Sequence, residues 1–248
     1  MPMKWLLCWL CVLCPLAWGD ARSAQQLSEI SSRSQLLCAS AMVYFDPGER
    51  APDPRSLTAV FYHLNTLDTY VLQLGQPPAL LQPLRAMQRL FAELDRLPRN
   101  QRERYPALIS QLLSAQHLLQ QAASQAYAQQ GVPDSAPQQL FGAQSQAMAS
   151  LLLDYQRRNY PLPESPQSAL KPAQLQALDQ QIEQGFERLL AQYGEHAQVL
   201  DKARSNYQFV RRQLQQERGR AHGGLEFYLS RTVIDLDELA QTLAGRQG

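Results

Sequence analysis

The chain has 248 residues, of which 45% are hydrophobic and 18% charged, and its formal net charge at pH 7 is +1. This near balance lacks the basic excess that nucleic acid or an anionic membrane surface attracts, so we predict no nucleic-acid partner. The length suffices for one large domain or two small ones.

Residues 1–19 have the three-part layout of a secretory signal peptide. Lys4 precedes an uncharged apolar run, and small residues follow at Ala17 and Gly19. The run of about a dozen residues is too short to cross the roughly 30 Å of a bilayer as a helix. We therefore expect cleavage, export to the periplasm and a soluble mature chain without a membrane span. A retained membrane anchor is the alternative.

Cleavage would remove three of the four cysteines. Cys8, Cys11 and Cys14 lie in the signal, and each follows a leucine, which argues against a lipoprotein signal. The mature chain would keep only Cys38, so a disulfide framework within one chain and a c-type haem attachment site are both excluded. Cys38 sits in an apolar pattern, and we expect it to be buried; an exposed thiol that dimerises the protein is the alternative.

Apolar residues recur at three- and four-residue intervals along nearly the whole mature chain, which predicts amphipathic helices and no strands. Prolines separate the segments, and Gly75, Gly131 and Gly194 stand where helix C-caps are expected. The pattern predicts an all-α helical bundle of about eight helices. Their expected ranges are roughly 23–45, 55–74, 78–97, 104–130, 137–158, 172–193, 196–217 and 223–244.

The eight predicted helices look like four helices used twice. A shift of 119 positions places Gly75 on Gly194 with the flanking apolar patterns in register, and a shift of 111 places Tyr44 on Tyr155. Because the helix order and the positions of the glycines and prolines between the helices repeat as well, we expect two tandem four-helix units. The alternative is that any two amphipathic helices can be aligned. The expected boundaries are 1–19 for the signal peptide, 20–131 for the first unit and 132–248 for the second.

The sequence shows no residue spacing typical of an enzyme or a metal site. The histidines are scattered, at His63, His117, His196 and His222, so we expect them at surface or half-buried positions and predict no metal or other cofactor. Neither a glycine-flanked serine elbow nor a glycine-rich phosphate loop occurs. We predict that the chain is not an enzyme. A helical hydrolase or metal enzyme is the remaining alternative.

Two charged clusters near the C-terminus are expected to be solvated helix surface. The basic cluster is interrupted by an acidic residue and lacks the aromatic residues on which nucleic-acid bases stack. The acidic cluster could in principle perform acid–base work, but it continues a polar stripe. The members are Arg211, Arg212, Arg218 and Arg220 in the first and Asp235, Asp237 and Glu238 in the second.

The first mature helix carries a family pattern. Residues 31–44 place a small residue before Arg33, then a Leu-Leu pair, Cys38 and small residues leading to Tyr44. This resembles the opening helix of the PilJ-type sensor domain of type IV pilus methyl-accepting transducers and nitrate/nitrite-sensing receptors. Residues 178–194 and 199–214 resemble the second and third helices of the same family.

The resemblance implies a periplasmic four-helix sensor or ligand-binding module, present twice, with a small anion as a ligand. The candidate ligand-binding residues are Arg33, Gln35 and Gln146, the last being the counterpart of Gln35 under the 111-residue shift. A surface arginine is the alternative for Arg33. Without a membrane span of its own, the module would pass its signal by contact with a membrane receptor or another periplasmic protein. A structural or assembly role without a ligand is the alternative.

Overall fold

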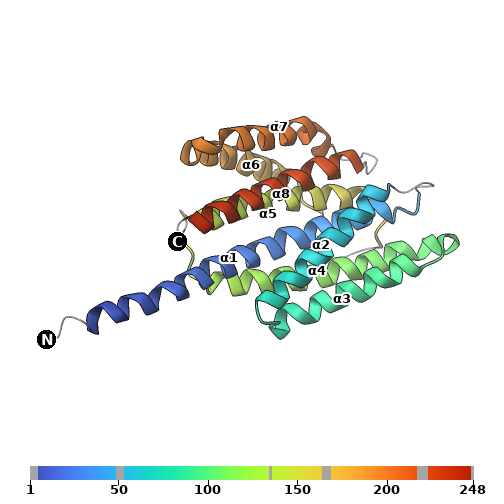
Figure 1. The fold of residues 1–248 in the computed structure, drawn as a ribbon. Helices are drawn as coiled ribbons and strands as arrows, with labels where there is room; N and C mark the ends of the chain where they lie inside the picture. The colour runs from blue at the N-terminus through green and yellow to red at the C-terminus, as the bar shows by residue number, and fades with distance from the viewer. Residues whose placement is uncertain (1–4, 49–52, 134–135, 164–168, 217–222, 247–248) are drawn as a thin grey trace.

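A computed structural model of the protein describes residues 5–48, 53–133, 136–163, 169–216 and 223–246. These residues form eight α-helices and two short 3₁₀ helices, without a strand, which confirms the all-α prediction (Figure 1). The helices are α1 (Trp5–Tyr44), α2 (Pro54–Gln73), α3 (Pro78–Arg96), η1 (Arg99–Arg104), α4 (Tyr105–Ala128), α5 (Pro137–Asn159), α6 (Pro172–Gln192), η2 (Gly194–His196), α7 (Ala197–Leu214) and α8 (Gly223–Arg246).

Helices α2 to α8 begin and end within three residues of their predicted ranges. Proline is the first residue of α2, α3, α5 and α6. A proline fits this position because its fixed φ is already helical and its missing N–H would have no partner in the first turn. Prolines in the sequence therefore set the starts of these four helices.

Helix α1 differs from its prediction, because it begins at Trp5 and not near residue 23. The apolar segment before residue 23 is helical although Pro15 lies within it, a residue that usually interrupts a helix. Residues 1–4 of the predicted signal peptide lie outside the described residues. Cleavage of residues 1–19 stays a prediction.

Glycine caps were predicted at three helix ends, and two are present. Gly75 and Gly131 have φ values of 82° and 62°, in the left-handed region that glycine adopts without a steric penalty. The amide of Gln76 also donates to the carbonyl of Val71, which completes a Schellman motif. The prediction is wrong for Gly194, because that residue opens the 3₁₀ turn η2 and the chain turns directly into α7.

The molecule has two apolar cores, one built mainly from α1 to α4 and the other from α5 to α8. Helices α1 and α5 lie between them, with α6 and α7 at one outer side and α3 at the other (Figure 1). The two central helices run parallel, since Gln35 of α1 meets Ser150 of α5, and ten residues further along both chains Phe45 meets Tyr160. The two halves of the chain therefore form one packed body.

One side-chain contact recurs between corresponding helices of the two halves. Ser34 of α1 accepts a hydrogen bond from Gln116 of α4, and Ser145 of α5 donates one to Asp237 of α8. Ser145 follows Ser34 by 111 residues, which is the predicted shift between these helices. This recurrence supports a tandem duplication, which stays a prediction.

Candidate functional site

Helix α1 is packed against α2, α4, α5 and α8, so that even its polar residues are buried. Buried polar groups need hydrogen-bond partners, because an unpaired one retains the full penalty of its lost hydration. The buried polar side chains of α1 are Gln25, Gln26, Glu29, Ser31, Ser32, Arg33, Ser34, Gln35 and Ser40. Many of them gather into a charged cluster on one side of α1 and an uncharged seam on the other.

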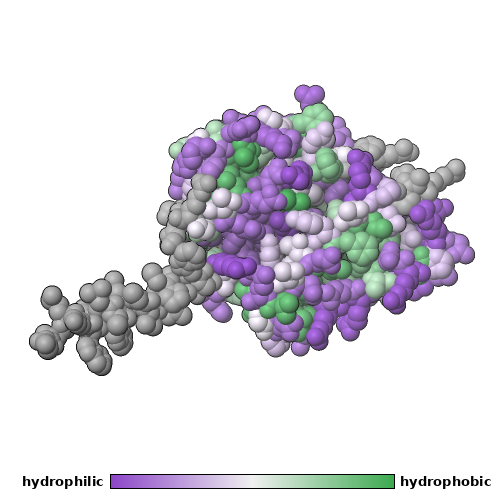
Figure 2. Space-filling model, viewed as in Figure 1, coloured by the Kyte–Doolittle hydropathy of each residue, from purple (hydrophilic) through white to green (hydrophobic). Residues whose placement is uncertain are grey.

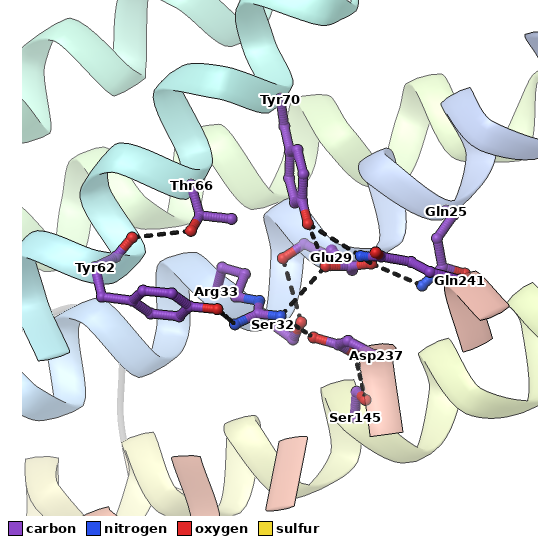
Figure 3. A network of polar contacts seen from close by, with 10 residues as sticks. All are labelled: Gln25, Glu29, Ser32, Arg33, Tyr62, Thr66, Tyr70, Ser145, Asp237 and Gln241. Atoms are coloured by element: carbon purple, nitrogen blue, oxygen red, sulfur yellow. Dashed lines mark hydrogen bonds and ion pairs between the residues drawn. The ribbon is translucent and has the colours of Figure 1, made fainter. Parts of the chain in front are cut away.

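Arg33 is the centre of the charged cluster (Figure 3). Its side chain is 2% exposed, and its Nη2 lies 3.4 Å from Glu29 Oε2 and 3.1 Å from Asp237 Oδ2. The guanidinium carbon lies 5.6 Å from the centroid of the Tyr62 ring, a cation–π distance. The alternative of a surface arginine is therefore wrong, and the positive charge of Arg33 already has two buried carboxyl partners.

The carboxyl groups around Arg33 are held by neutral donors from three further helices. Tyr70 Oη donates to Glu29 over 2.6 Å, Gln241 Nε2 donates to Glu29 over 2.7 Å, and Ser145 Oγ donates to Asp237 over 2.7 Å. The cluster thus joins α1, α2, α5 and α8. It links the two four-helix halves through charge as well as through apolar contact.

The expectation of a solvated acidic face is wrong for Asp237, whose residue is 1% exposed. Burial raises the pKa of Asp237, and the nearby Glu29 raises it further, whereas Arg33 and the Ser145 hydrogen bond act in the opposite direction. Burial lowers the pKa of Arg33, but Asp237 and Glu29 more than offset this effect and keep the guanidinium charged. The burial of Asp237 could not be predicted, because the residues that contact it are distant in the sequence.

His63 also departs from its expected surface or half-buried position. It is fully buried on the apolar stripe of α2, and neither ring nitrogen has a hydrogen-bond partner among the described residues. Burial, with a smaller effect of Arg33, lowers the pKa of His63 to about 3. The imidazole is therefore neutral at physiological pH. His117 is exposed and His196 half-buried, as expected, and His222 lies outside the described residues.

The uncharged seam lies between α1, α4 and α5. Gln35 Nε2 of α1 donates to Ser150 Oγ of α5 over 3.0 Å and approaches Gln120 Oε1 of α4 at 3.4 Å. Gln116 Nε2 donates to Gln120 over 2.9 Å and to Ser34 over 3.3 Å. Amides and hydroxyls from both halves of the chain therefore pair with one another along the seam, without a charged group.

A cavity of about 210 Å³ lies between the same three helices. Its residues come from both halves, and apart from three small or apolar side chains they carry only hydroxyl and amide groups. They are Leu27, Ser28, Ser31, Ser124, Tyr127, Gln139, Gly142, Ala143 and Gln146. Gly142 allows the close approach of α1 here, since a Cβ at that position would lie 2.2 Å from Ser28 Oγ.

The structure thus places Gln35 in the seam and Gln146 in its cavity, whereas Arg33 faces the opposite side of α1. Sequence reasoning missed the serines of the cavity, because neutral hydroxyls form no recognisable motif. A signal was nevertheless present, since Ser28, Ser31 and Gln35 recur at the three- and four-residue spacing of one helix face.

The thiol of Cys38 and the basic cluster of α7 were also expected to be buried and solvated, respectively. Cys38 is a free thiol and 1% exposed, which confirms its expected burial, and the loss of hydration raises its pKa. Arg211 is not simply solvated, because its guanidinium binds both carboxylate oxygens of Asp179 at 2.6 Å. Arg212 is exposed as expected, and Arg218 and Arg220 lie outside the described residues.

Within the described part of the chain, no three His, Cys, Asp or Glu side chains are placed to share a metal ion. None of the described helices combines the length and apolarity needed to cross a membrane. Comparison with family models, with curated proteins and with solved structures finds no match to this chain.

Proposed function

We propose that the protein is an exported, non-catalytic helical binding module that takes a small uncharged polar molecule in the cavity between α1, α4 and α5. One observation carries this proposal: the cavity is lined by hydroxyl and amide groups from both halves of the chain. Such groups donate and accept hydrogen bonds and so match the hydroxyls of a sugar or polyol.

The charge distribution favours an uncharged ligand over the anion that the PilJ-type resemblance implies. An anion at Arg33 would have to compete with Glu29 and Asp237 for a guanidinium that is 2% exposed. The cavity that holds Gln146 contains no charged side chain. A ligand there would contact residues of both halves, so binding could change how they pack and be read by a membrane-bound or periplasmic partner.

A thermal-shift screen of the purified mature chain tests the proposal. Monosaccharides, polyols and small neutral amides form the first set of compounds, and nitrate, nitrite and phosphate form the second. A ligand present at 100 times its Kd stabilises the native state by about 2.7 kcal/mol, so a member of the first set should raise the Tm by several degrees.

The variant Gln146→Leu should abolish that shift, whereas Gln198→Leu, at an exposed position of α7 remote from the cavity, should retain it. A shift with the anions alone would contradict the uncharged-ligand proposal. No shift with either set, together with capture of a membrane receptor, would favour the alternative, an adaptor or assembly protein without a ligand.

A further inference from the structure

A basic groove runs along the outer side of α3 and η1, remote from the cavity. It is shallow and open to solvent, with a volume of about 740 Å³. Its lining includes Arg85, Arg89, Arg96 and Arg104, together with Glu93, Gln88 and Gln101. Hydrophilic residues gather along the lower right edge of the molecule, where α3 and its connection to α4 lie in Figure 1 (Figure 2).

Three of these four arginines lack an acidic partner. Arg104 lies 3.2 Å from Glu93, but no ion pair joins Arg85, Arg89 or Arg96 to a carboxylate within the part of the chain that the structure describes. All three are exposed on α3. The groove therefore carries positive charge that the protein itself does not neutralise.

The second half of the chain provides an internal comparison under the 119-residue shift. Arg204, the counterpart of Arg85, lies 2.9 Å from Glu183 and 3.5 Å from Glu187. In the first half Leu64 stands in place of Glu183, and Asp68, in place of Glu187, accepts a hydrogen bond from Gln88 instead. The charge that is neutralised in the second half is thus left free in the first.

The remaining two arginines have no basic counterpart at all. Gln208 and Gln215 stand where Arg89 and Arg96 would fall under the same shift. The free positive groove is therefore particular to the first half and is not a by-product of the shared helix pattern. A surface that departs from its own repeat in this way has the character of a binding surface.

The spacing of the arginines indicates an elongated acidic ligand. Arg85, Arg89 and Arg96 are four and seven residues apart, so they lie on one face of α3 and span roughly 16 Å along its axis. A single small anion could contact one or two of them. An extended peptide, with alternate side chains about 7 Å apart, could present carboxylates to all three, and each guanidinium can bind a carboxylate through two hydrogen bonds.

We propose that this groove binds an extended acidic segment of a partner protein. The lining contains no aromatic side chain on which a nucleic-acid base could stack, which favours a peptide over single-stranded nucleic acid. The inference does not depend on the ligand cavity, because the two sites share no residue.

Fluorescence anisotropy of the full mature chain tests the inference, with a labelled ten-residue peptide of alternating Glu and Ser as the probe. The triple variant Arg85→Gln, Arg89→Gln, Arg96→Gln should weaken peptide binding at least tenfold. A matched triple variant, Arg22→Gln, Arg188→Gln, Arg212→Gln, removes the same charge from other exposed positions and should change the affinity less than twofold.

Circular dichroism checks that both triple variants remain folded, and Gln146→Leu should leave peptide binding unchanged, so the two proposals can fail separately. Equal losses in the two triple variants would reveal nonspecific attraction and overturn the inference. It would also be overturned by a wild-type chain that does not bind the peptide at low salt, or that prefers an oligonucleotide of equal charge.

Discussion

Arg33 shows how a residue that looks like a surface group becomes part of the interior. Its segment, Ser-Ser-Arg-Ser-Gln, is polar and would suit solvent, but α1 is enclosed by four helices. A buried ion pair contributes little net stability over an apolar replacement, because both charges lose their hydration. Removing only the arginine destabilises the folded state much more, because the two carboxylates then remain buried without a positive partner.

Replacement of Arg33 by Met should therefore lower the free energy of unfolding by about 3–5 kcal/mol, because Glu29 and Asp237 remain buried without a cation. The measurement is urea unfolding followed by circular dichroism. Arg231→Met is a matched control, as Arg231 is 56% exposed in its pair with Asp235 and should lose no more than about 1 kcal/mol. Similar losses in the two variants would contradict the central role of Arg33.

His63 makes stability depend on pH in a definite direction. Its pKa is lowered to about 3 in the folded state from 6.5 when unfolded, so the unfolded chain binds the proton more readily. The associated stability is complete above pH 6.5 and is lost as the pH falls through the folded pKa. Between pH 7 and pH 5 we expect the contribution of His63 to the free energy of unfolding to fall by about 2 kcal/mol.

Urea unfolding at a series of pH values measures this loss. The stability difference between the wild type and His63→Leu should fall by about 2 kcal/mol between pH 7 and pH 5, whereas the difference between the wild type and His117→Ala, at an exposed histidine, should stay constant. Asp237 and Glu226, whose pKa values are raised, act in the opposite direction, but they are present in every variant and cancel in each difference. Asp179, whose pKa is lowered, loses its stabilising effect only as the pH falls below 3.8, so it does not contribute in this interval. A difference between the wild type and His63→Leu that does not change with pH would show that His63 is reached by water.

At the scale of helices, the sequence predicts where each element ends better than which element lies inside. Prolines and a capping glycine act locally, so the boundaries of α2 to α8 follow from nearby residues. Burial of α1 and α5 on all sides depends on partners more than 100 residues away, as in the contact of Gln35 with Ser150. For the same reason the pairing of Arg33 with Asp237 could not be predicted from the sequence, whereas Gln35 and Gln146 stay predicted ligand-binding residues.

The groove of α3 was overlooked for a different reason. The spacing of Arg85, Arg89 and Arg96 on one helix face is readable in the sequence. The absence of acidic partners for these arginines cannot be read from the sequence, because it depends on which residues of α2 lie against α3. Only the structure shows that Arg204 is neutralised by Glu183 and Glu187 while Arg85 is not.

The close approach of α1 and α5 rests on Gly142. The variant Gly142→Ala would place a Cβ 2.2 Å from Ser28 Oγ and 3.2 Å from Ser28 Cβ, so the Ser28 hydroxyl must rotate away and Ser28 must move by a few tenths of an ångström. We expect a loss of about 1–3 kcal/mol in unfolding free energy, the usual effect of overpacking. The double variant Gly142→Ala, Ser28→Gly should recover most of it. Gly224→Ala, with open space around it, should not destabilise the protein.

At the scale of the whole molecule, two separate apolar cores would ordinarily suggest two independently unfolding domains. The structure argues for one cooperative unit. Helices α1 and α5 are buried by both halves, and Leu36 and Ala39 of α1 belong to the core of the second half. The pair of Arg33 with Asp237 also spans the boundary, so neither half can unfold without exposing buried charge and apolar surface of the other.

Differential scanning calorimetry should therefore show a single transition whose calorimetric and van't Hoff enthalpies agree. Leu84→Ala in the first core and Leu229→Ala in the second should each lower the free energy of unfolding by about 2–5 kcal/mol, because both leucines are fully buried. Each variant should move the same single transition to a lower temperature. If Leu229→Ala instead divides the trace into two transitions, with the first half unfolding at its original temperature, the contact between α1 and α5 does not couple the halves, and a ligand in the cavity between them could not act on both.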